Sequence, residues 1–185
     1  FVGYIKCPDI ISETNSMEIP IMSAQDIQAI PVAGALGAEI SGIDLGAPLS
    51  DAVIADIRSA LLEFGVVFFH DQDFDASAHK SLARRFGEIF VHPFFVPGDD
   101  PEIVNIIREP TDTSIVGQDW HADTQMVPQP PMGAILYGVD VPAYGGDTLF
   151  ANQYLAYEAL SDGMKRMLDG LRAVNSDRLV AGPGH

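Results

Sequence analysis

Trp120-His121-Ala122-Asp123 is the most informative segment of this 185-residue chain. In an extended strand, side chains two positions apart project from the same face, so an imidazole and a carboxylate would stand side by side here. Such a pair can bind one metal ion. Two His and one carboxylate on one face of an octahedron are typical of mononuclear Fe(II) sites. The sequence shows two of these ligands, His121 and Asp123.

The same pair has a plainer interpretation. A His-x-Asp sequence recurs by chance in many proteins, and alone it favours a solvated or structural pair. Its context favours a site, because a long polar loop over 109–118 precedes it and strand-like sequence follows. We therefore predict a strand over 120–124 at the mouth of a sheet. Trp120 and Ala122 would point the opposite way, into the core.

The flanking sequence predicts alternating helices and strands. An apolar stripe at helical spacing lies between a Ser50 cap and a Gly65 stop, and a short buried strand should follow over 66–69. Asp75 should cap a second helix ending at Gly87. The remaining predicted elements are strands within 35–43, 103–107 and 133–139, and helices capped by Asn152 and Ser161, the last with a buried stripe of Met164, Met167, Leu168 and Leu171.

Several other side chains could contribute to a site. The Thr148 hydroxyl, after the Gly145-Gly146-Asp147 turn, can donate to a carboxylate, but it is equally a β-branched strand residue. His92 could hold an acidic group, although a structural role is favoured. His185 could supply a third metal ligand, but it is poorly held at the terminus. The remaining candidates are His70 and His79 as surface residues, and Arg108, Arg172 and Arg178 as carboxylate clamps.

Composition narrows the class of protein. Apolar residues make up 47% of the chain, which indicates a globular domain. The net charge of −16 argues against nucleic acid and anionic membranes as partners. Cys7 is the single cysteine, so a disulfide framework is excluded and a reducing cytoplasm is the expected location. We expect residues 1–16 to be an extension or disordered, and 17–185 to form one domain.

Taken together, the chain resembles the TauD/TfdA family of Fe(II)- and 2-oxoglutarate-dependent dioxygenases. The likeness runs from about Gly34 to about Asn175 and rests on many segments in the right order. These are 37–45, Gly65-Val66-Val67-Phe68-Phe69 with Gln72, Arg85-Phe86-Gly87-Glu88, Trp120-His121-Ala122-Asp123, Pro130-Pro131, Gly145-Gly146-Asp147-Thr148-Leu149, 156–161 and 168–173.

The resemblance implies a mainly β fold, a double-stranded β-helix (jelly roll) flanked by helices and incomplete at its C-terminal side. It implies His121 and Asp123 as iron ligands, and Thr148 as a residue binding the carboxylate of the co-substrate 2-oxoglutarate. His92 and Phe95 fall where family members contact the substrate. The second iron-binding His and the 2-oxoglutarate Arg of the family lie further downstream than this chain extends.

The implied reaction uses Fe(II), O2 and 2-oxoglutarate to hydroxylate a small anionic organic substrate, of the taurine and sulfonate or the aryloxyalkanoate type, and releases succinate and CO2. Homo-oligomers are common in the family. Two alternatives stay open. One is a catalytically inactive jelly-roll fragment that binds a small acid or a partner protein. The other is a metal site completed by another chain with the help of His185.

Overall fold

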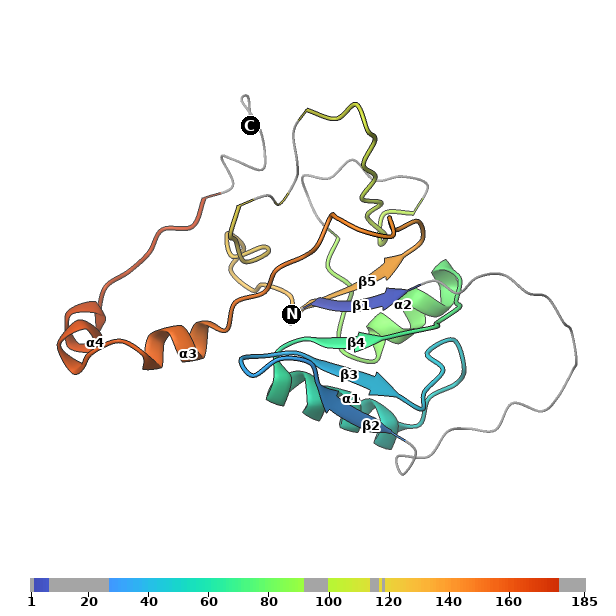
Figure 1. The fold of residues 1–185 in the computed structure, drawn as a ribbon, viewed down its shortest axis with the longest axis horizontal. Coiled ribbons are helices and arrows are strands. Elements are labelled where there is room, and N and C mark those ends of the chain that lie inside the picture. The colour runs from blue at the N-terminus through green and yellow to red at the C-terminus, as the bar shows by residue number, and fades with distance from the viewer. Residues whose placement is uncertain (1, 7–26, 92–99, 114–116, 118, 177–185) are drawn as a thin grey trace, which may run out of the picture.

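The computed structural model describes residues 2–6, 27–91, 100–113, 117 and 119–176. A single five-stranded sheet organises this part of the chain, in the order β2-β3-β4-β1-β5 (Figure 1). The strands are β1 (Val2–Lys6), β2 (Gln28–Pro31), β3 (Ala38–Ser41), β4 (Val67–Phe69) and β5 (Ala134–Gly138). The helices are α1 (Asp51–Phe64), α2 (Ala76–Arg84), α3 (Gln153–Glu158) and α4 (Asp162–Leu168).

The sheet is mixed. β2 and β3 form an antiparallel hairpin, whereas β3, β4, β1 and β5 run parallel to one another. Parallel neighbours need a crossover connection, and α1 supplies it between β3 and β4. The arrangement confirms the predicted combination of a sheet with flanking helices. The predicted jelly roll stays a prediction.

Helix α1 begins and ends where the sequence predicts. The Val53 amide donates to the Ser50 hydroxyl at 3.3 Å, which satisfies one of the free amides of the first turn. Gly65 closes the helix with φ +74°, a conformation that favours glycine, and its amide donates to the Leu61 carbonyl. The predicted buried strand follows at once as β4.

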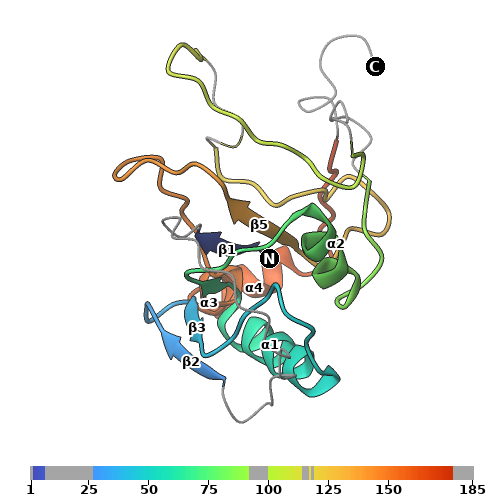
Figure 2. The same ribbon diagram turned by 90° about the vertical axis from the view of Figure 1, so that its right-hand side faces the viewer.

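One core lies between the sheet and the two N-terminal helices. Alternate residues of β3 and β4 are buried, Ile40 and Phe69 among them, and they pack in one cluster with residues of α1 and α2. Figure 2 shows α1 and α2 beside the strands. The core residues are Ile40, Ile43, Leu45, Val53, Ile54, Ile57, Ala60, Val67, Phe69, Phe74 and Leu82. On the other face of β4, Phe68 packs edge-on against Phe150, with their ring centroids 6.3 Å apart.

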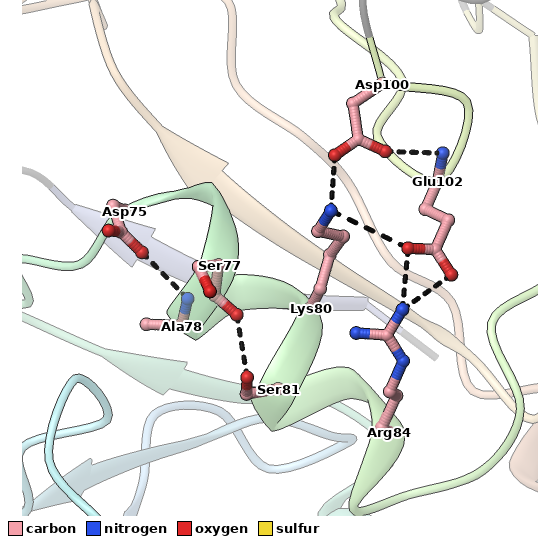
Figure 3. A network of polar contacts seen from close by, with 8 residues as sticks. All are labelled: Asp75, Ser77, Ala78, Lys80, Ser81, Arg84, Asp100 and Glu102. Atoms are coloured by element: carbon pink, nitrogen blue, oxygen red, sulfur yellow. Dashed lines mark hydrogen bonds and ion pairs between the residues drawn. The ribbon is translucent and has the colours of Figure 1, made fainter.

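Helix α2 is tied to the chain around residue 100 by four charged side chains (Figure 3). Lys80 donates to Asp100, and Arg84 donates to both carboxylate oxygens of Glu102 at 2.7 Å. The hydrogen bond with Asp100 raises the pKa of Lys80, and the same bond lowers the pKa of Asp100. Asp100 also accepts from the Glu102 amide at 3.0 Å, so it shapes the turn that it anchors.

Helices α3 and α4 lie at one end of the molecule, away from the sheet (Figure 1). Asn152 and Ser161 cap them as predicted. The predicted buried stripe of α4 is wrong, because Met164, Met167, Leu168 and Leu171 are all exposed. Met164, Met167 and Leu168 do lie in the helix, whereas Leu171 follows its end, and these three helix residues are not buried by any described element.

Two further expectations need correction. Residues 103–107 form no strand; a turn held by Asp100 precedes them, and Ile106 and Ile107 are exposed. Helix α2 ends at Arg84 rather than at Gly87, and Phe86 packs against the core from the following turn.

Residues 2–6 fall within the segment expected to be an extension or disordered. They form β1, which pairs with β4 on one side and β5 on the other. The interpretation of residues 1–16 as an extension or disordered stays a prediction. Residues 7–16 lie outside the described part of the chain. None of the described helices combines the length and the apolar character needed to cross a membrane.

Candidate metal centre

The segment that carries His121 and Asp123 lies on the β5 side of the sheet (Figure 1, yellow). It is not the strand predicted over 120–124. The chain turns directly after Asp123, where Thr124 adopts φ +55° and its carbonyl accepts from the Val127 amide at 3.2 Å. Left-handed backbone is incompatible with a continuing strand. Trp120 is also 70% exposed, so the prediction that it points into the core is wrong.

The ring of His121 is held by the backbone that precedes it. Nδ1 lies 2.7 Å from the Asp119 carbonyl oxygen, and because a carbonyl can only accept, Nδ1 carries the proton and donates it. The ring also lies against Gly117, where an added Cβ would stand 3.3 Å from His121 Cε1. The imidazole is therefore fixed in one tautomer, with Nε2 left for another partner.

That partner is Asp123. Its Oδ1 lies 3.1 Å from His121 Nε2, and both side chains are more than half exposed. A neutral imidazole with its proton on Nδ1 presents a lone pair at Nε2, and a carboxylate oxygen also offers only lone pairs. Two acceptors in contact need a cation between them, and either a second ring proton on Nε2 or a metal ion satisfies both. A metal-binding His typically donates its other ring N–H to a carbonyl or carboxylate, as His121 does.

The donor set therefore fits a divalent metal ion. One imidazole nitrogen and one carboxylate oxygen suit Fe(II), and they would fill two positions of an octahedron. Among the described residues, no group of three or more His, Cys, Asp or Glu side chains comes together in a way that could hold a metal ion. His185 lies outside the described residues.

The other predicted site residues are not brought to this pair. Thr148 is exposed in the connection between β5 and α3, and within the described part of the chain no hydrogen bond joins it to His121 or Asp123. His92, Phe95 and Arg178 lie outside the described residues.

The two other histidines in the described part of the chain have structural contacts. His70 is on the surface as predicted, and its Nε2 lies 2.8 Å from Glu39 Oε1. His79 is half-buried rather than fully exposed, because α2 packs it against Phe74 and its Nε2 donates to the Ile135 carbonyl at 3.1 Å. Burial lowers the pKa of His79, and the hydrogen bond to Ile135 partly opposes this shift.

Comparison with known proteins bears on the function of this pair. The sequence model of the family described as "Taurine catabolism dioxygenase TauD, TfdA family" matches residues 28–182. This chain belongs to the TauD/TfdA family. The match includes the His-x-Asp segment, the Gly145-Gly146 turn and both C-terminal helices.

Individual TauD/TfdA relatives agree with this assignment. An alpha-ketoglutarate-dependent sulfate ester dioxygenase from Pseudomonas putida is 33% identical over 83% of this chain and 51% of its own length. An (S)-phenoxypropionate/alpha-ketoglutarate-dioxygenase from Sphingobium herbicidovorans is 31% identical over 79% of this chain and 52% of its own length.

A solved structure is similar as well. The crystal structure of a taurine dioxygenase from Burkholderia xenovorans superposes with a TM-score of 0.63 at 33% identity, covering 78% of this chain and 51% of that one. The chain thus spans about half the length of the TauD/TfdA relatives it matches.

Sequence reasoning missed two residues that shape the pair. Gly117 could have been found, since a glycine four residues before a candidate ligand is a signal for close approach of the backbone. Thr124 could not, because a β-branched residue gives no sign of left-handed backbone.

Proposed function

We propose that this chain carries the first His and the carboxylate of the iron site in an Fe(II)- and 2-oxoglutarate-dependent dioxygenase. The observation that supports this most directly is the geometry of His121, whose Nδ1–H donates to Asp119 while Nε2 faces Asp123 Oδ1 at 3.1 Å. When bound, iron together with 2-oxoglutarate would supply the activation of O2. The residues of the chain hold the ion and fix the tautomer of its imidazole ligand.

The proposed substrate is a small anionic organic molecule of the sulfonate, sulfate ester or aryloxyalkanoate type, hydroxylated with release of succinate and CO2. The similarity to the Pseudomonas sulfate ester dioxygenase and to the Sphingobium (S)-phenoxypropionate dioxygenase supports this class. Thr148 would bind the 2-oxoglutarate carboxylate, and His92 and Phe95 would contact the substrate. The proposed fold of the complete enzyme is the double-stranded β-helix.

A binding experiment on the 185-residue chain tests the metal site directly. Trp120 is the single tryptophan and is the neighbour of His121, so a paramagnetic ion at the pair should quench its fluorescence. We expect saturable quenching by Fe(II) without oxygen, or by Co(II), and at least about tenfold weaker binding after His121→Ala or Asp123→Asn. The matched control is His70→Ala, which removes the other exposed His–carboxylate pair.

Equal quenching of wild type, His121→Ala and Asp123→Asn would contradict the proposed site. An inactive domain that binds a small acid or a partner protein would then become the better interpretation. If the site binds metal, decarboxylation of 2-oxoglutarate in the presence of taurine, an alkyl sulfate ester or phenoxypropionate tests the activity and distinguishes the substrate types.

A further inference from the structure

Thr124 follows Asp123 directly and has a backbone conformation that its side chain disfavours. Its φ is +55°, and the only other non-glycine residue described with a positive φ is Asp71. Asp and Asn tolerate left-handed backbone because their short polar side chains bond locally, whereas a β-branched residue does not. The strained residue is therefore the direct neighbour of a proposed metal ligand. Strained backbone conformations cluster at functional sites in proteins.

The hydroxyl of Thr124 is a second costly feature. Its Oγ1 is buried and has no hydrogen-bond partner, and it is the single such side-chain atom among the described residues. A buried hydroxyl without a partner destabilises a fold, and valine would fill the same volume without that cost. Glycine or asparagine would adopt the backbone with less strain. Local stability therefore favours other residues at this position on both counts.

We propose that Thr124 is a positioning residue of the metal site formed by His121 and Asp123. Its backbone turns the chain directly after Asp123. Its hydroxyl would form a hydrogen bond with a water molecule that is bound to the divalent cation. An ion with an octahedral preference keeps several waters when this chain supplies two ligands. The inference rests on the proposed function, since it needs a metal ion at this pair.

The test compares Thr124→Val, which keeps the β-branching but lacks the hydroxyl, with Thr124→Ser, which keeps the hydroxyl. Thr111→Val is the control, because Thr111 is exposed and outside the site. The full 185-residue chain is unfolded with urea in the presence of EDTA, and Co(II) affinity is measured from the quenching of Trp120. Both readouts are independent of enzymatic turnover.

We expect Thr124→Val to be at least as stable as the wild type in EDTA, because it removes an unpaired hydroxyl, and yet to bind Co(II) about tenfold more weakly. Thr124→Ser should bind within about twofold of the wild type. A loss of stability for Thr124→Val in EDTA would overturn the proposal, because the hydroxyl would then have a partner in the metal-free protein.

Wild-type Co(II) affinity in Thr124→Val would also overturn it. A wild-type chain that shows no saturable quenching overturns the metal site itself, and with it this inference. A wild type that binds Co(II) through His121, together with an unaffected Thr124→Val, overturns the inference about Thr124 and leaves the proposed function standing.

Discussion

The Asn152 side chain joins two parts of the chain that are 117 residues apart. Its Nδ2 donates to the Ala35 carbonyl at 2.8 Å, while its Oδ1 accepts from the Leu155 amide at 3.0 Å. One amide group thus caps α3 and fastens the start of α3 to the turn between β2 and β3. Since α3 buries none of its own residues, the hydrogen bond from Asn152 to Ala35 and the contact between Phe68 and Phe150 connect the start of α3 to the sheet.

Replacing Asn152 should therefore release α3. We expect Asn152→Ala to lose about 1–2 kcal/mol of unfolding free energy, because the cap and the bond to Ala35 both disappear. Asn152→Ser keeps a capping oxygen but has no amide donor, so it should retain about half of the stability that Asn152→Ala loses. Hydrogen exchange of the α3 amides checks this. Equal protection in the wild type, Asn152→Ala and Asn152→Ser would show that the hydrogen bond to Ala35 does not stabilise α3.

Gln72 is the buried polar side chain of the core, and its loss should be costly. It accepts from the Leu45 amide at 2.7 Å and donates to the Ile43 and His70 carbonyls at 3.0 and 2.8 Å. Gln72→Leu would leave these three backbone groups unpaired and should cost roughly 2–4 kcal/mol in urea unfolding. Gln28→Leu, at an exposed position of β2, should change stability by less than about 0.5 kcal/mol. A similarly small effect at both positions would refute the role of Gln72.

These contacts show which part of the structure local sequence predicts. All four predicted caps, Ser50, Asp75, Asn152 and Ser161, accept from the amide three residues on, because the bond depends on the cap and its own helix. The exposure of Trp120 and of the α4 stripe was not predictable in this way. Burial depends on which elements, distant in the sequence, pack against a residue. The apolar spacing of a helix does not predict which element will cover its apolar face.

The site illustrates a different limit. His121 and Asp123 lie close together as predicted, but strand alternation, on which the prediction rested, is not the cause. Strand alternation would place them on one face, whereas the structure brings them together through a turn at Thr124 and a hydrogen bond from His121 to the Asp119 carbonyl. The residue types were sufficient to predict that these two side chains lie close together, whereas the left-handed backbone at Thr124 is a conformation that threonine rarely adopts and could not be predicted.

Stability should fall in mild acid because of His79. Its pKa is lowered in the folded protein, so between that lowered value and about 6.5 the unfolded chain binds more protons than the folded one. Unfolding free energy therefore rises with pH through this window and levels off above it. Urea unfolding from about pH 7.5 to about pH 5.5 should show a smaller loss of stability in His79→Gln than in the wild type. Parallel pH profiles of the two proteins would contradict this account.

Gly117 should matter for the metal site through both its conformation and its small size. Its φ is +78°, and an added Cβ would stand 3.3 Å from His121 Cε1, so alanine has to strain the backbone and press on the ring. Gly170 provides a matched control, since its φ is +82° but an added Cβ would meet nothing within 4 Å. Both substitutions should cost about 1–2 kcal/mol through backbone strain.

Only Gly117→Ala should also displace the imidazole. We expect it to weaken Co(II) binding about tenfold, measured by quenching of Trp120, while Gly170→Ala binds like the wild type. Similar stability of the two variants makes the comparison of affinities direct, because loss of folded protein then contributes equally to both. If Gly117→Ala binds Co(II) as tightly as Gly170→Ala, the contact between Gly117 and His121 does not affect metal binding. The hydrogen bond from His121 to Asp119 then suffices to orient the ring.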